Sequence, residues 1–162
     1  MYKRTRELIK ECLKILRQPP LVSIMEWANQ YRVLDTTSAK EVGKFNVERT
    51  PYMIEIYEKI TKGETKQVTL MMAAQLAKSE LIINTILRYA HLDPCPMLIV
   101  QPTDEMARSF SKERIQPAIN NSVLNTIIKE PSKKDSGNTV THKMFPGGYI
   151  AFVGANSPSK LA

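Results

Sequence analysis

The chain has 162 residues, a size typical of one domain, and 43% of them are apolar, which is enough for one ordinary core. Its 23 Lys and Arg against 16 Asp and Glu give a formal charge of +7, which favours polyanionic partners such as nucleic acid or nucleotide. No apolar run has the length of a membrane span or a signal peptide, so the sequence predicts a soluble intracellular protein. Two cysteines and two histidines lack the spacing of a zinc site, which argues against metal chemistry through these residues.

The basic charge is concentrated in residues 1–20, which hold six basic and two acidic residues, the basic ones between Lys3 and Arg17. Leu8, Ile9 and Leu13 recur at helical spacing, so this segment is predicted to be a basic amphipathic helical arm of about four turns. Two interpretations are open. The arm is either solvated and docked on the core, or it is a docking helix for another subunit or for DNA.

Residues 21–65 are predicted to form a helical lead-in. Ser23 and Glu26 have the spacing of a capping box at the start of a short helix. Residues 32–49 show no sustained period and are expected to be irregular. Thr50 as N-cap and Pro51 at the first helical position then predict a third helix that ends near Gly63.

Residues 66–162 have an α/β pattern. The apolar run 67–72 predicts a core strand, which is followed by a helix from Lys78 to about His91 and a second strand at 97–100. Thr103 is expected to cap the next helix, which has acids in its first turn. This βαβα alternation predicts a mainly parallel core sheet with flanking helices.

The remaining signals lie nearer the C-terminus. Pro117 is expected to end or kink the helix that begins near residue 104, and a further helix is expected over 118–129. A polar loop then covers 131–138. Strands at 139–145 and 149–153 are predicted to form a hairpin around Pro146-Gly147-Gly148.

The turn at 72–79 carries the candidate chemistry. A phosphate-binding loop reads G-x-x-x-x-G-K-[ST], in which backbone N–H groups and the lysine bind phosphates and the hydroxyl binds magnesium. Lys78 and Ser79 match this pattern, whereas Met72 and Ala77 replace the two glycines. Ala77 is expected to strain the loop by about 1 kcal/mol. The simpler interpretation is an ordinary helix start with Ser79 as its cap and Glu80 in its first turn.

Several stretches along the chain together resemble one family. They are Ser23–Ala28 with Tyr31-Arg32, Arg49–Tyr52, Ala73–Glu80, Asn84, Asp93-Pro94, Gln101–Thr103, Phe110–Arg114 with Pro117, and Gly154–Ser159 with Leu161-Ala162. In this order they resemble the N-terminal part of the large terminase subunit of lambda-like tailed bacteriophages, the ATPase that drives DNA into procapsids. Residues 73–80 are similar to the family's A-Q-x-G-K-[ST]-E loop.

The resemblance implies a fold and a site. The fold would be P-loop NTPase-like, with ATP and Mg²⁺ as cofactors. The phosphate-binding residues would be Gln75, Leu76, Ala77, Lys78 and Ser79. Lys78 would neutralise phosphate charge, Ser79 would be the magnesium ligand, and Glu80 would remain structural.

The resemblance also implies an adenine-side segment and a set of partners. Arg49, Pro51 and Tyr52 are similar to the segment that contacts adenine in related motors, although Tyr52 is equally well interpreted as a core aromatic. The implied partners are double-stranded DNA, the small terminase subunit and the portal or procapsid, in the host bacterial cytoplasm.

The family's acidic strand and nuclease domain are not found in these residues. We therefore expect 162 residues from the first part of a larger ATPase, which bind ATP weakly and do not hydrolyse it alone. One alternative is an interaction module that acts without nucleotide and uses the basic N-terminal helix to bind the small subunit or DNA. Another is a plain basic nucleic-acid-binding domain.

Overall fold

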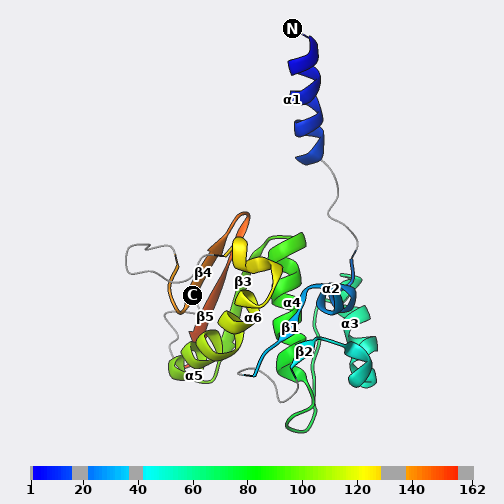
Figure 1. Ribbon diagram of the computed structural model, residues 1–162. Coiled ribbons are helices and arrows are strands. Elements are labelled where there is room, and N and C mark those ends of the chain that lie inside the picture. The colour runs from blue at the N-terminus through cyan, green and yellow to red at the C-terminus, as the bar shows by residue number, and fades with distance from the viewer. Residues whose placement is uncertain (1, 16–21, 37–41, 129–137, 157–162) are drawn as a thin grey trace.

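The computed structural model describes residues 2–15, 22–36, 42–128 and 138–156. Within these ranges the chain is a mixture of helices and a small sheet, as Figure 1 shows. Helix α4 (Lys78–Leu92) lies between the sheet on one side and helices α2 (Ile24–Tyr31) and α3 (Ile54–Thr61) on the other. None of the helices in these ranges is both long and apolar enough to span a bilayer.

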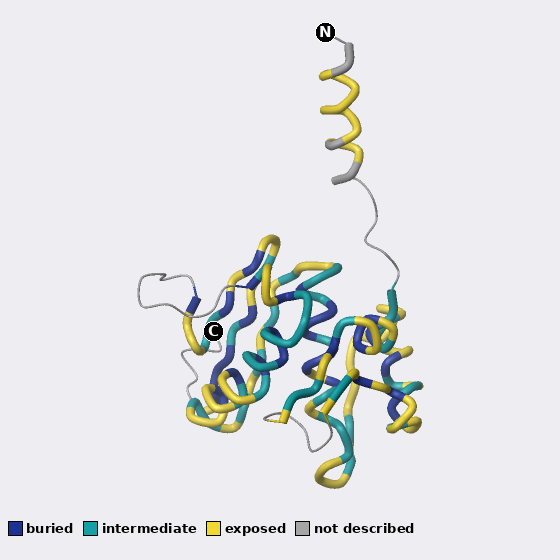
Figure 2. Tube along the Cα trace, in the orientation of Figure 1, coloured by how far each residue is buried: buried dark blue, intermediate teal, exposed yellow. Residues whose placement is uncertain are grey.

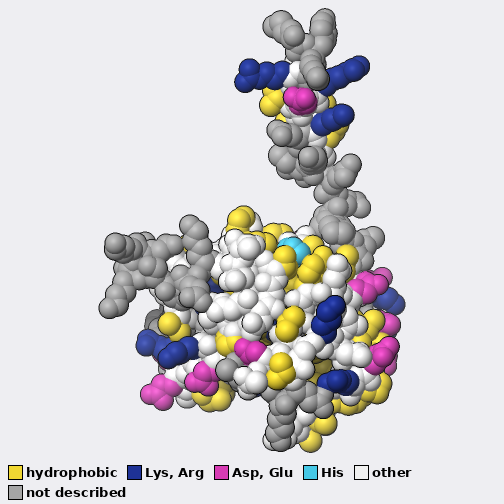
Figure 3. Space-filling view, viewed as in Figure 1, with side chains coloured by type: hydrophobic (Ala, Val, Ile, Leu, Met, Phe, Trp, Pro, Cys, Tyr) yellow, Lys and Arg dark blue, Asp and Glu magenta, His cyan; other side chains and the backbone are white. Residues whose placement is uncertain are grey.

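Helix α1 (Tyr2–Ile15) confirms the predicted N-terminal helix. It stands apart from the rest of the described chain in Figure 1, and Figure 3 shows basic side chains projecting from it. Its apolar residues Leu8, Ile9 and Leu13 are 56%, 53% and 55% exposed. The interpretation of α1 as an arm docked on the core is therefore wrong for these side chains. Residues 16–20 of the predicted arm lie outside the described ranges.

The lead-in contains the predicted capping box. The Glu26 amide donates to Ser23 Oγ at 3.0 Å, and the Ser23 amide donates to Glu26 Oε2 at 2.9 Å. The segment 32–49 is predicted to be irregular, but its described residues contain two short strands, β1 (Val33–Leu34) and β2 (Gly43–Lys44), which pair antiparallel. A 3₁₀ turn, η1 (Val47–Arg49), follows. Residues 37–41 lie outside the described ranges.

The third helix forms in two parts. A 3₁₀ turn, η2 (Pro51–Met53), precedes α3, and Pro51 occupies an early position as expected. Thr50 is the N-cap by position, but its hydroxyl donates to the Val47 carbonyl at 3.3 Å and makes no capping bond. The prediction that Thr50 caps through its side chain is therefore wrong, because the preceding 3₁₀ turn engages the hydroxyl first.

The sheet has three strands in the order β3-β5-β4. Strand β3 (Pro96–Gln101) runs parallel to β5 (Gly148–Gly154), and β4 (His142–Phe145) runs antiparallel to β5. The predicted hairpin is confirmed, with Gly147 at φ +88° in its turn. Its first strand begins at His142 rather than at 139. The sheet is mixed, so the prediction of a mainly parallel sheet is not met among the described residues.

The predicted core strand at 67–72 is not a strand of this sheet. Met71 is fully exposed and Val68 is 42% exposed. Within the described chain, the backbone of residues 67–71 pairs with no other backbone. Val68 and Leu70 instead form one wall of an apolar groove of about 650 Å³, and β3 lies in another wall. An apolar run predicts burial, but it does not by itself determine whether the segment pairs with a strand.

Pro117 does not end its helix. Helix α5 (Asp104–Ser109) continues through a π-helical turn, η3 (Phe110–Ile115), into α6 (Gln116–Asn120). In this wider turn the Gln116 amide donates to the Ser111 carbonyl, five residues back. The π-helical turn immediately precedes the proline, whose ring would clash with a carbonyl in a regular α-helix.

The helix predicted over 118–129 is also wrong. Helix α6 stops at Asn120, and Ser122 accepts from the Leu124 amide to cap a separate 3₁₀ turn, η4 (Val123–Thr126). Residue 129 and the predicted loop at 131–137 lie outside the described ranges.

Helix α4 provides the centre of the core. Figure 2 shows buried residues along α4 and the sheet, whereas the described part of α1 is exposed. Leu81, Ile83 and Leu87 of α4 are at most 3% exposed, as are Trp27 of α2 and Ile150 of β5. The position of α4 is therefore fixed by packing along most of its length.

A histidine at the end of α4 makes this packing sensitive to pH. Trp27 Nε1 donates to His91 Nδ1 at 2.9 Å, which requires that this nitrogen is unprotonated. Partial burial lowers the pKa of His91 in the folded state. The contribution of neutral His91 to stability is therefore complete above the pKa of histidine in the unfolded chain, about 6.5. It is lost as the pH falls through the lower pKa of His91 in the folded state.

We expect urea unfolding, followed by the fluorescence of the single tryptophan, to show lower stability at pH 5 than at pH 7.5. His91→Gln keeps a hydrogen-bond acceptor without titrating in this range, so it should reduce the difference between the two pH values. His142→Gln is the matched control and should leave the difference intact. An equal effect of the two substitutions would contradict this assignment.

Candidate phosphate-binding loop

Residues 72–79 form the turn that leads into α4. Two of its residues have positive φ although neither is glycine: Gln75 at +61° and Ala77 at +55°. A left-handed conformation costs a residue with a Cβ about 1 kcal/mol or more. The strain expected at Ala77 is confirmed. The same strain at Gln75 was not apparent from the sequence, because the motif requires no glycine at that position.

The start of α4 differs from an ordinary capped helix. Its N-cap is Ala77, which offers no side-chain hydrogen bond. The interpretation of Ser79 as the cap is therefore wrong, since Ser79 is the second residue of the helix. The first amides of a helix have no intrahelical acceptor, and their dipoles favour an anion. The loop and the start of this 15-residue helix thus present backbone donors suited to phosphate.

Lys78 adds a positive charge to the same turn. Its Nζ donates to the carbonyl oxygen of Met72 at 2.7 Å and to that of Ala73 at 2.9 Å. The side chain therefore folds back across the loop, and its ammonium group lies against the loop backbone. Gln75 is exposed, and Leu76 and Ala77 are half-buried. All five predicted phosphate-binding residues belong to this one turn.

The hydrogen-bond donors and the positive charge of the loop fit a nucleoside triphosphate. An ammonium group and several helix-start amides bind phosphate oxygens, and the exposed hydroxyl-bearing residue Ser79 supplies an oxygen ligand of the type that Mg²⁺ prefers. Across the described residues, no group of three or more His, Cys, Asp or Glu is placed to hold a metal ion. Of the residues in the loop, Ser79 is the one suited to hold magnesium.

The predicted adenine-side residues lie on turns η1 and η2. Arg49, Pro51 and Tyr52 are exposed, and Tyr52 retains 48% of its accessible surface. The alternative that Tyr52 is a core aromatic is therefore wrong. Tyr57, on α3, takes that place: it is 1% exposed, and burial raises its pKa to about 12. Among the described residues, no hydrogen bond or ring contact joins Tyr52 to the phosphate loop, so its adenine role remains a prediction.

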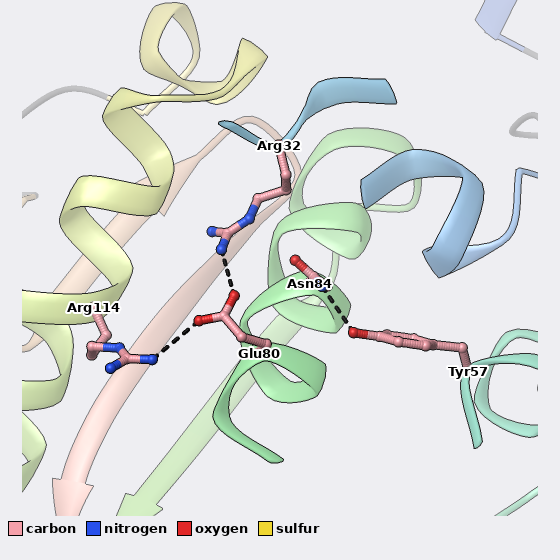
Figure 4. A network of polar contacts seen from close by, with 5 residues as sticks. All are labelled: Arg32, Tyr57, Glu80, Asn84 and Arg114. Carbon is pink, nitrogen blue, oxygen red and sulfur yellow. Dashed lines mark hydrogen bonds and ion pairs between the residues drawn. The ribbon is translucent and has the colours of Figure 1, made fainter. Parts of the chain in front are cut away.

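The sequence reasoning missed an ionic cluster beside the loop. Glu80 accepts hydrogen bonds from Arg32 and Arg114, and one turn further along α4 Asn84 Nδ2 donates to Tyr57 Oη at 2.9 Å (Figure 4). Four of these residues lie in the stretches named in the sequence analysis, and Tyr57 contacts one of them, Asn84. Nothing in the local pattern pairs them, because the residues that bond to each other are 27 to 48 positions apart in the chain.

The geometry therefore makes residues 72–79 a candidate anion-binding loop at the start of the central helix of a mixed helix-and-sheet domain. Residues 39–162 match the family described as "Phage terminase large subunit gpA, ATPase domain". This match covers well over half of the chain, so the chain belongs to that family.

Two curated proteins are similar to most of the chain. The large terminase subunit of Escherichia phage lambda is 25% identical over 147 residues, which cover 90% of this chain and 22% of that protein. The large terminase subunit of Enterobacteria phage P21 is 23% identical over 137 residues, which cover 84% of this chain and 21% of that protein. The chain thus spans about a fifth of the length of these relatives. No solved structure matches it.

The left-handed conformation of Ala77 gives a direct prediction. Ala77→Gly should stabilise the protein by about 1 kcal/mol, because glycine adopts positive φ without a Cβ penalty. Ala73→Gly is the control: Ala73 does not have positive φ, so this substitution should destabilise or have no effect. Urea unfolding measures both changes. If Ala77→Gly lost as much stability as the control, the left-handed conformation of Ala77 would be contradicted.

Proposed function

We propose that this chain binds ATP through the loop at 72–79 and that, in the intact protein, it is part of the P-loop ATPase domain that powers the packaging of viral DNA into procapsids. The observation that carries the proposal is the Lys78 ammonium group held across a strained loop at the start of the buried helix α4. Membership of the terminase ATPase family supports the same function.

Each residue of the loop has a role in this proposal. The backbone N–H groups around Gln75, Leu76 and Ala77 and those of the first turn of α4 would bind phosphate oxygens. Lys78 would leave the carbonyl oxygens of Met72 and Ala73 and neutralise charge on the outer phosphates, which is its catalytic contribution. The Ser79 hydroxyl would hold Mg²⁺, and the metal when bound would offset charge that develops on the phosphates. Arg49, Pro51 and Tyr52 would contact adenine.

The partners in this proposal are those of a packaging motor: double-stranded DNA, the small terminase subunit and the portal or procapsid, in the host bacterial cytoplasm. The two curated relatives are large terminase subunits, which supports this assignment. The excess of basic residues in the chain is consistent with a polyanionic substrate.

A second function is supported by α1. More than half of the surface of Leu8, Ile9 and Leu13 is exposed on one helix that also carries Arg4, Arg6 and Lys10. An exposed apolar face of this kind is typical of a helix that binds in the groove of a partner. We propose that α1 binds the small terminase subunit, with DNA as the alternative ligand of its basic residues.

Calorimetry with Mg·ATP tests the first proposal. We expect the 162-residue chain to bind weakly, Lys78→Ala to reduce the affinity at least about tenfold, and Ala77→Gly to increase it. Lys62→Ala, at an exposed lysine after α3, is the control for loss of one positive charge. Equal affinities of the Lys78 and Lys62 variants would refute a phosphate role for Lys78.

Co-purification with the small terminase subunit tests the second proposal. The double substitution Leu8→Ser and Leu13→Ser should abolish binding while leaving the core folded, because these side chains are exposed. Val42→Ser, at a residue that is 64% exposed, is a matched control. Binding that survives the double substitution but is lost at high salt would instead indicate a purely electrostatic contact.

A further inference from the structure

The first turn of α4 lacks the usual means of fixing a helix start. Its N-cap, Ala77, has a left-handed backbone and makes no capping bond. The turn nevertheless carries Lys78 and Ser79, whose side chains need a defined orientation to bind a phosphate and a metal. Glu80, the third residue of the helix, forms ion pairs that connect this turn to distant parts of the chain.

Glu80 binds two guanidinium groups from different parts of the chain. Its Oε2 accepts from Arg32 Nη2 at 2.6 Å, and its Oε1 accepts from Arg114 Nη2 at 3.1 Å (Figure 4). Arg32 is the C-cap residue of α2, and Arg114 lies in the π-helical turn η3. The carboxylate therefore connects the lead-in, the phosphate loop and the helix that follows β3.

The two arginines are held differently. The Arg32 side chain is 1% exposed, and its Nε and Nη1 have no hydrogen-bond partner within the described residues. Burial lowers the pKa of Arg32, and the charge of Glu80 opposes this shift. A guanidinium in this environment needs its carboxylate, so the Arg32–Glu80 pair is a fixed anchor. The Arg114 side chain is 39% exposed, so its pair with Glu80 can be broken at lower cost.

The location of Arg114 suggests what the weaker pair does. π-Helical turns are uncommon and occur frequently at functional sites. Arg114 also borders a shallow depression together with Gln101, at the carboxyl end of β3. A displacement of the first turn of α4 would therefore alter a contact made by the helix that follows this strand.

We propose that Glu80 is a positioning residue for the phosphate loop: its pair with Arg32 holds Lys78 and Ser79 in the orientation that binds triphosphate, and its pair with Arg114 couples occupancy of the loop to the π-helical turn 110–115. This inference rests on the proposed binding of ATP. It assigns Glu80 a role beyond the structural one expected from the sequence.

The direction in which Glu80→Gln changes the affinity for Mg·ATP distinguishes a positioning role of Glu80 from a purely electrostatic one. If Glu80 acts only as a negative charge near the phosphates, Glu80→Gln tightens Mg·ATP binding. If it positions the loop, the same change weakens binding, by about tenfold. Arg114→Gln should weaken binding less, and Arg114→Lys should restore part of the loss. Glu58→Gln and Arg108→Gln, at exposed residues of α3 and α5, are matched controls and should leave the affinity unchanged.

Amide hydrogen exchange provides a readout that does not need nucleotide. In the ATP-free protein, Glu80→Gln should speed exchange at residues 80–83, and Arg114→Gln should speed it there and in 110–116. Addition of Mg·ATP to the unaltered chain should change exchange in 110–116, and Arg114→Gln should abolish that change. If burial of an unpaired Arg32 prevents Glu80→Gln from folding, the double change Glu80→Gln with Arg32→Met removes both charges.

The outcomes distinguish this inference from the function on which it rests. If Mg·ATP does not bind but Glu80→Gln speeds exchange at 80–83, the proposed function fails and the positioning of the turn by Glu80 stands. If Mg·ATP binds and Glu80→Gln binds it equally or more tightly, with unchanged exchange at 80–83, the positioning role is overturned.

Discussion

The two ion pairs of Glu80 fix the start of helix α4, and the arrangement of the proposed site depends on that helix. Buried residues hold α4 along most of its length, but its first turn has no side-chain cap. The carboxylate of Glu80 supplies the missing constraint by binding Arg32 and Arg114. The strained loop therefore leads into a helix whose start is fixed, and the Lys78 side chain folds back across the loop.

Local signals in the sequence were sufficient for much of this architecture. The Ser23–Glu26 capping box, the Thr103 cap and the turn at Gly147 each depend on residues within four positions of one another. The loop at 72–79 was predicted from the Lys78-Ser79 pair together with the resemblance of stretches along nearly the whole chain to one family. The backbone strain at Ala77 also followed from the sequence, because the motif has glycine where this chain has a residue with a Cβ.

The features that the sequence did not reveal depend on distant contacts. Residues 67–72 have the composition of a core strand, but pairing is decided by a neighbouring edge that composition does not show. The helix continues past Pro117 through a π-helical turn instead of ending there, because a wider turn accommodates the proline ring. The cluster of Arg32, Glu80 and Arg114 joins three segments far apart in the chain, so no spacing rule would have assembled it.

We propose that the loop at 72–79 receives the phosphates of ATP, and amide chemical shifts measure this binding residue by residue. In a titration of the ¹⁵N-labelled chain with Mg·ATP, we expect saturable shifts concentrated at residues 74–80, with smaller shifts in 110–116. The absence of shifts at 74–80 at millimolar Mg·ATP, or shifts confined to α1, would contradict it.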